Sequence, residues 1–208
     1  AGMYLDRTLF IRTEALRRWL WEKYEEWHWS RKNQAMGRAV ACYPFDSAPE
    51  AALDAMTATE TESVILHELG EAQIGAQLGG AWEGLLMAVL RSRAEIMVRA
   101  VPDLYADCLS TLPGLIERGD PAAIHFYFAN LVGMRRKLAP ELLVAYQHWL
   151  AQGDLAHLRE VVAEGGQLWK TEVDALLALH GALGEGIGPA VEARMATRLA
   201  CEAATMTK

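Results

Sequence analysis

Apolar residues recur at three- and four-residue spacing along almost the whole chain, and this periodicity limits the possible folds more than any other feature. In residues 4–29, for example, Leu16, Leu20, Tyr24 and Trp27 form one stripe of a helix. No run of four or five residues alternates convincingly between apolar and polar, as a half-buried strand would. The sequence therefore predicts an all-α fold, a multi-helix bundle of roughly seven to nine helices with no sheet.

Capping residues, glycines and prolines divide this pattern into helices. Ser47-Ala-Pro-Glu50 and Thr59-Glu-Thr-Glu62 both have the spacing of a capping box, and the second is expected to open a helix that ends at Gly79-Gly80. The later helices are expected at residues 82–100, 103–119 with an interruption near Pro113-Gly114, 121–138, 140–151, 154–165, 167–181 and 187–204.

The length of 208 residues suits one domain. We expect a single helical domain over 1–208, composed of a Trp-rich first helix (4–29), a connecting loop with a short helix (30–58) and a helical core (59–204). No self-similar period of about 34 to 45 residues is visible, which argues against a helical repeat array.

Composition and charge exclude several classes of protein. The net charge of −7 argues against a protein that binds nucleic acid, and no apolar run is long enough to form a transmembrane segment. The N-terminus lacks the order of a signal peptide. The chain has three widely separated cysteines and no CxxC pair, namely Cys42, Cys108 and Cys201. Isolated cysteines of this kind are typical of buried thiols in a reducing compartment. We therefore expect a cytoplasmic location.

Four of the seven tryptophans, Trp19, Trp21, Trp27 and Trp29, lie in the second half of the first predicted helix. One interpretation is a helix that is packed on both sides. The other is a docking surface for a protein partner or for a second copy of the chain. Because glutamates 14, 22, 25 and 26 lie on its polar face, an anionic membrane surface is a poor alternative.

The stretch SVILHELGEAQIGAQLGG (63–80) is the strongest candidate for a chemical site. On an ideal helix, Glu60, His67 and Glu71 lie within about 40° of one another. They share that stripe with Val64, Ile74 and Leu78, so the face is not simply turned to water. Carboxylates on a buried face need partners, and an adjacent imidazole suggests a shared metal ion.

Iron or manganese is the favoured cation, with zinc less suited, and other helices of the bundle would complete the site. His125, in the apolar segment AIHFYF, is the main candidate for a ligand from a second helix, and His28, His148, His157 and His180 are further candidates. Alternatively, His67 and Glu71 pair with each other or with Arg91, Arg93 or Arg99.

Two family resemblances rest on this helix. The segment ILHELGEAQIG resembles the active-site helix of zinc metallopeptidases. The resemblance implies that His67 is a zinc ligand and that Glu68 is the catalytic base. Glu71 stands where these enzymes have their second zinc-binding histidine. The spacing of Glu60 and His67 is similar to that in helical di-iron proteins such as the haem-oxygenase-like oxidases. A later helix of that family carries the motif His-x3-Asp-x2-His. This chain has Leu150, Asp154 and His157 at the three corresponding positions, so the first histidine is absent.

Three functions remain open. The first is a metal-binding helical protein with Glu60, His67, Glu71 and His125 as ligands, extended to an oxygen-dependent oxidase or hydroxylase. The second is a non-catalytic interaction or accessory protein that docks a partner through its Trp-rich N-terminal helix. The third is an enzyme that acts on an organic substrate without a metal.

Overall fold

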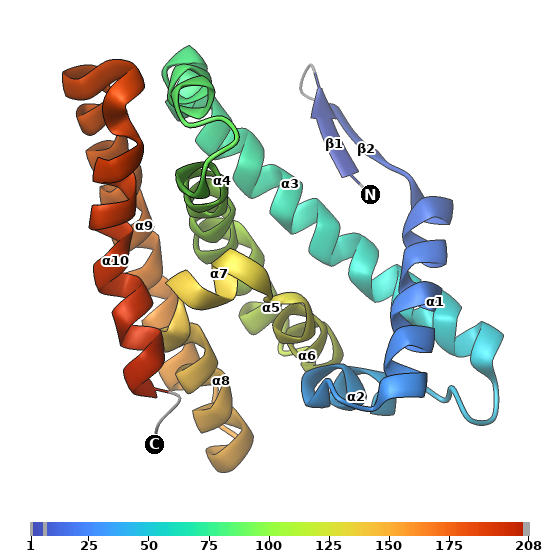
Figure 1. The fold of residues 1–208 in the computed structure, drawn as a ribbon. Helices are drawn as coiled ribbons and strands as arrows, with labels where there is room; N and C mark the ends of the chain where they lie inside the picture. The colour runs from blue at the N-terminus through green and yellow to red at the C-terminus, as the bar shows by residue number, and fades with distance from the viewer. Residues whose placement is uncertain (1, 6–7, 206–208) are drawn as a thin grey trace. The chain divides into compact units, whose positions relative to one another are not determined.

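A computed structural model describes the backbone of residues 2–5 and 8–205 and the side chains of residues 8–199 (Figure 1). The expected all-α class is confirmed, because helices make up most of this chain. The helices are α1 (Thr13–Ser30), α2 (Gln34–Ala41), α3 (Pro49–Ala88), α4 (Arg93–Ala106), α5 (Leu112–Arg118), α6 (Pro121–Asn130), α7 (Gly133–Leu138), α8 (Pro140–Gln152), α9 (Ala156–Leu183) and α10 (Gly188–Thr205), with a π-helical turn η1 (Asp107–Thr111) and a 3-10 turn η2 (Gly184–Ile187).

The first expected helix begins later than its apolar pattern indicates. Strands β1 (Gly2–Leu5) and β2 (Thr8–Ile11) pair antiparallel, with Gly2 opposite Ile11, and α1 follows from Thr13. Along β2, residues alternate between exposed and partly buried, which is the period of a strand. The expectation of a helix from residue 4 is therefore wrong for residues 4–5 and 8–12, and residues 6–7 lie outside the described chain.

The segment expected to be a loop at residues 30–46 contains α2. Asn33 caps this helix by accepting a hydrogen bond from the Met36 N–H at 3.1 Å, and it donates one to the carbonyl oxygen of Ala129 at 2.9 Å. Met36, Ala39 and Val40 are buried. Two turns are too short to show a clear period, so tertiary packing rather than propensity stabilises this helix.

Several expected helix boundaries are also different. No helix begins at Thr59, which lies inside α3, and the helix expected at 121–138 is divided into α6 and α7. Gly79 leaves the helical region with φ 53° and ψ −156°, but α3 resumes after it and continues to Ala88. The helix expected at 82–100 is instead broken before α4, where Arg91 has a φ of 58° and Ser92 caps α4. The expected end at Gly165-Gly166 does not occur, and α9 continues through both glycines.

The fold consists of two compact units, each described by itself below. Unit 1 comprises residues 1–69 and 110–131, and unit 2 comprises residues 70–109 and 132–208. The single domain expected from the length stays a prediction. None of the described helices is both long enough and apolar enough to cross a membrane.

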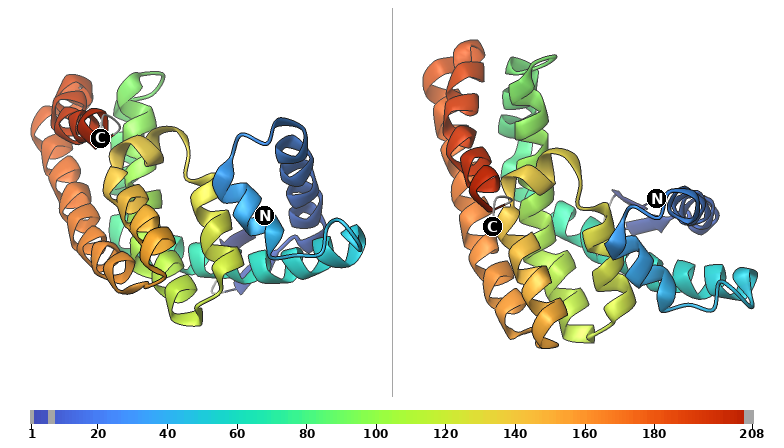
Figure 2. Two further views of the ribbon diagram at one scale, coloured as in Figure 1. Left: turned by 90° about the horizontal axis from the view of Figure 1, so that it is seen from below. Right: turned by 60° about the horizontal axis from the view of Figure 1, so that its bottom comes forward.

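Unit 1 has one apolar core, to which α1, α2, α6 and the first part of α3 contribute. The helices α2 and α6 pack along each other, and α1 crosses the first turns of α3 (Figures 1 and 2). The buried members of this core are Leu16, Leu20, Met36, Ala39, Val40, Phe45, Ala52, Leu53, Met56, Phe126 and Ala129. Because Leu16 and Leu20 are one turn apart, they fix which side of α1 faces inward.

Unit 2 is built around α9, which packs against α4 and α8, while α10 packs against α4 (Figure 2). Trp169 of α9 is fully buried. At Gly165, a Cβ atom would lie 2.7 Å from Sγ of Cys108 in η1. Only glycine allows this close approach, which explains why a residue that usually weakens a helix lies inside α9.

Candidate functional site

The four predicted site residues of α3 differ strongly in exposure. Glu60 is 3% exposed, His67 and Glu68 are partly buried, and Glu71 is exposed. Glu68 lies against the N-terminal hairpin, since a Cβ atom on Gly2 would be 2.6 Å from its Cγ atom. The stripe that joins Glu60, His67 and Glu71 on a helical wheel is therefore not one uniformly buried face.

Glu60 is the most unusual of these residues because its carboxyl group is buried with incomplete hydrogen bonding. Its Oε1 atom has no hydrogen-bond partner of ordinary geometry within the described chain. Burial raises the pKa of Glu60 to about 8, with a smaller contribution from Asp120 in the same direction. Ser63 and Arg118 lower the pKa of Glu60, but by less than burial raises it. At pH 7 this carboxyl group is therefore mainly protonated.

His125 lies on α6 and is 9% exposed. Burial lowers the pKa of its imidazole, and the nearby Arg38 lowers it further. A neutral imidazole is the form that binds a metal ion. However, no three His, Cys, Asp or Glu side chains among the described residues lie close enough to hold an ion together. The metal set of Glu60, His67, Glu71 and His125 therefore stays a prediction.

The cysteines have two different environments. Cys42 is exposed, whereas Cys108 is 3% exposed against Gly165. Burial raises the pKa of the Cys108 thiol well above its usual range, so this thiol is an inert part of the core. The side chain of Cys201 lies outside the described residues.

The inner side of α1 explains part of its tryptophan content. Tyr24 stacks on Phe45 with ring centroids 4.2 Å apart, and Trp19 meets Phe126 edge-on at 5.7 Å. Trp21 and Trp27 are partly buried against the core of unit 1. These rings bury apolar area in the manner of a helix that packs on its neighbours.

The outer side of α1 carries a different set of side chains, which we term the α1 ridge. On an ideal helix the ridge covers an arc of about 100°, opposite Leu20. All of its members are exposed, and Trp29, at 84%, is the most exposed large apolar side chain among residues 8–199. The ridge consists of Arg18, Glu22, Glu25, Glu26 and Trp29. It therefore combines three carboxylates and one indole with a single guanidinium.

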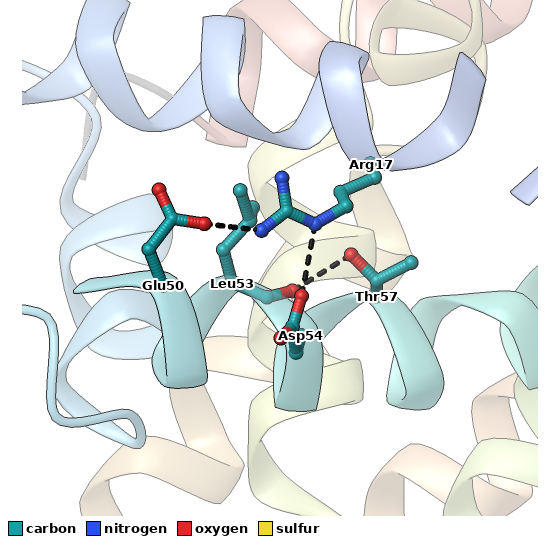
Figure 3. A network of polar contacts seen from close by, with 5 residues as sticks. All are labelled: Arg17, Glu50, Leu53, Asp54 and Thr57. Carbon is teal, nitrogen blue, oxygen red and sulfur yellow. Dashed lines mark hydrogen bonds and ion pairs between the residues drawn. The ribbon is translucent and has the colours of Figure 1, made fainter. Parts of the chain in front are cut away.

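Burial of Leu16 and Leu20 orients α1, and surface ion pairs with α3 lie on the side away from the ridge. Arg17 of α1 donates hydrogen bonds to Glu50 at 2.6 Å and to Asp54 at 2.9 Å, as Figure 3 shows. In the same network, the Thr57 hydroxyl donates to the carbonyl oxygen of Leu53 at 2.7 Å. Since Arg17 lies about 140° around the helix from Glu22, the ridge faces away from α3.

An indole at the end of α1 already holds a guanidinium group. The Arg31 guanidinium carbon lies 4.2 Å from the centre of the Trp27 ring, which is the geometry of a cation–π contact. Arg31 also donates to the carbonyl oxygen of His28 at 3.0 Å. Trp29, two residues from Trp27, has the same kind of ring but remains exposed.

A second candidate region lies in unit 2. A groove of about 660 Å³ is lined by residues of α8, α9 and α10. Its walls include the apolar side chains of Pro140, Val144, Val161 and Leu168. At its edge, Arg198 pairs with Glu141 and lies 4.8 Å from the centre of the Trp169 ring. With its guanidinium engaged in this way, Arg198 acts as a structural group of the groove wall.

The sequence pattern identified the tryptophans of α1 but not which of them are exposed. Trp29 shares one arc of an ideal helix with the glutamates at 22, 25 and 26, yet only the position of α1 against α3 shows that this arc is exposed. The groove could not be found from the sequence, because its walls come from three helices.

Comparison with known protein families gives a match over most of the chain. A model of the C-terminal domain of a family of unknown function (DUF6866) matches residues 17–198, which is most of the chain. No curated protein and no solved structure matches the chain.

Proposed function

The chain belongs to the DUF6866 family through this C-terminal domain, and we propose that it is a non-catalytic interaction module that binds a protein partner on the α1 ridge. The observation that carries the proposal is the 84% exposure of Trp29 beside Glu22, Glu25 and Glu26. An exposed indole with polar neighbours on a helix that is firmly held from behind is typical of an interface anchor.

The chemistry of the ridge favours a basic partner segment. Glu26 pairs with Lys23 at 2.9 Å, so Glu22 and Glu25 together with Arg18 leave the ridge with a small negative charge, and the chain as a whole has a net charge of −7. A segment that contains arginine or lysine complements this charge, and its cation can stack on Trp29 as Arg31 stacks on Trp27. Phosphate backbones and anionic membranes carry the same negative charge as the ridge and are therefore repelled.

Substitutions on the ridge test this proposal. In a Glu25→Lys/Trp29→Ala variant, we expect the affinity for the partner to fall at least tenfold, because an anchor residue contributes about 2 kcal/mol or more to binding. The immobilised domain is used to capture proteins from host extract, which are then quantified by mass spectrometry.

The matched control is Glu117→Lys, which reverses one exposed charge on α5 of the same unit. Proteins that bind the ridge should be retained by wild type and by this control, should be depleted by the ridge variant, and should contain a segment rich in lysine or arginine. Equal recovery by all three forms would contradict the proposal.

A metal site at α3 is the second candidate function, supported by the buried Oε1 atom of Glu60 that has no hydrogen-bond partner of ordinary geometry within the described chain. Iron or manganese suits carboxylate and imidazole ligands, and His67 and His125 are the nitrogen donors to test. If such an ion is present, tag-free protein should contain near-stoichiometric metal by elemental analysis, and His67→Ala should lose it while remaining folded. A negligible metal content in the wild-type protein removes this candidate.

We further propose a reducing compartment such as the cytoplasm. Cys42 and Cys108 are both free thiols in the described part of the chain, and the first of them is exposed. Free exposed thiols persist where disulfides do not form readily.

A further inference from the structure

Two histidines of unit 2 lie side by side at the junction of α8 and α9. His148 is in the last turns of α8 and His157 is in the first turn of α9, and their ring centroids are 4.9 Å apart with an interplanar angle of 69°. The short connection between the helices includes Gly153, whose φ of 75° ends α8. The tight turn therefore brings two imidazoles together from two different helices.

We propose that His148 and His157 form a binding site for a divalent transition-metal ion, with Zn²⁺ as the best-suited cation. An ion held at about 2.0–2.1 Å by one nitrogen of each ring places the ring centroids about 5 Å apart if the angle at the ion is near tetrahedral. The observed centroid separation of 4.9 Å agrees with this value. Imidazole nitrogen is a preferred ligand for Zn²⁺, whereas Ca²⁺ and Mg²⁺ require oxygen.

The surroundings of His157 support this assignment. Its Nδ1 atom lies 3.8 Å from Oε2 of Glu160, one turn further along α9. This separation is longer than a hydrogen bond, but the negative charge of Glu160 favours the tautomer with the proton on Nδ1, which leaves Nε2 for the metal. Asp154, the other nearby acid, accepts a hydrogen bond from the Ala156 N–H at 2.9 Å and holds the start of α9.

Both imidazoles are accessible to an ion from solution. His148 is exposed, and the His157 side chain is 43% exposed. Two protein nitrogens leave two positions of a four-coordinate ion for water or for a ligand from another molecule. This site is independent of the α1 ridge and of Glu60, which both belong to unit 1.

The test is calorimetric titration of the tag-free chain with Zn²⁺. Wild type should bind one ion, and His148→Ala should weaken the affinity at least tenfold. Glu160→Gln should weaken it about tenfold, the effect usual for a carboxylate behind a metal-binding histidine. The matched control is His28→Ala, which removes an exposed histidine of α1 and should leave the affinity unchanged. Circular dichroism verifies that each variant is folded.

A second measurement locates the ion. In a ¹⁵N spectrum of the histidine side chains, Zn²⁺ should shift the ring nitrogens of His148 and His157 together. The inference is overturned if wild type binds no Zn²⁺, or if His148→Ala binds it as tightly as wild type does. Loss of binding in His67→Ala but not in His148→Ala would also overturn it and would instead support the metal site at α3.

Discussion

Replacement of Arg135 by methionine is expected to lower the free energy of unfolding by about 3 kcal/mol, the low end of the usual cost of removing one partner of a buried ion pair, because Asp107 is buried whereas Arg135 is partly exposed. Arg135 of α7 donates a hydrogen bond to Oδ2 of Asp107 at 2.9 Å. The Asp107 side chain is only 1% exposed, so its charge would lose its cationic partner without gaining water. The measurement is chemical denaturation of wild type and variant at pH 7.

Two further variants show whether the ion pair is the cause. Arg136→Met removes the exposed neighbouring charge on the same helix and should change stability by less than about 0.5 kcal/mol. Asp107→Leu/Arg135→Met removes both charges and should recover much of the loss, since an apolar pair often replaces a buried ion pair without cost. Equal destabilisation by Arg135→Met and Arg136→Met would show that Asp107 does not depend on Arg135.

The free energy of unfolding of the wild-type protein is expected to fall between about pH 5 and pH 8 because of Glu60, and Glu60→Gln is expected to abolish this contribution. The pKa of Glu60 is raised from 4.5 to about 8 in the folded chain. In this window the folded state holds a proton that the unfolded state has released, so wild-type stability falls as the pH rises. For one such group the loss amounts to about 3 kcal/mol across the window.

The difference between wild type and Glu60→Gln isolates this effect, because the other titrating groups are common to both proteins. The amide has the shape of the protonated carboxyl group but does not ionise, so the variant should be the more stable protein at pH 8. The free energy of unfolding is measured by denaturation at intervals from pH 5 to pH 8. A constant difference between the two proteins over that range would contradict the raised pKa.

Most of the fold could be predicted because helical periodicity is a local signal. The stripe of Leu16 and Leu20 and the capping residues identified the long helices. The errors arose where non-local contacts decide the structure. The contact between Gly165 and Cys108 allows α9 to continue through a glycine pair, and the contact of α2 with α6 stabilises a helix that is too short to be recognised by pattern.

The candidate sites were less predictable. The burial of Glu60 could be predicted from its apolar neighbours on the helical wheel. The exposure of Glu71 could not, because a wheel does not show which turns of a helix are covered by other helices. The pairing of His148 with His157 was also missed. Its signal is one histidine on each side of a short turn that contains Gly153, and this becomes informative only when α8 and α9 are known to lie side by side.

The most direct test of the α1 ridge is photo-cross-linking in the host cell. A photoreactive amino acid replaces Glu25 in the ridge or, as the control, Glu117 on α5, and both positions are exposed. Our account predicts a discrete cross-linked product from position 25 that contains a lysine- or arginine-rich segment of another protein, and no such product from position 117. Cross-linking from position 25 that does not exceed the level from position 117 would contradict the account.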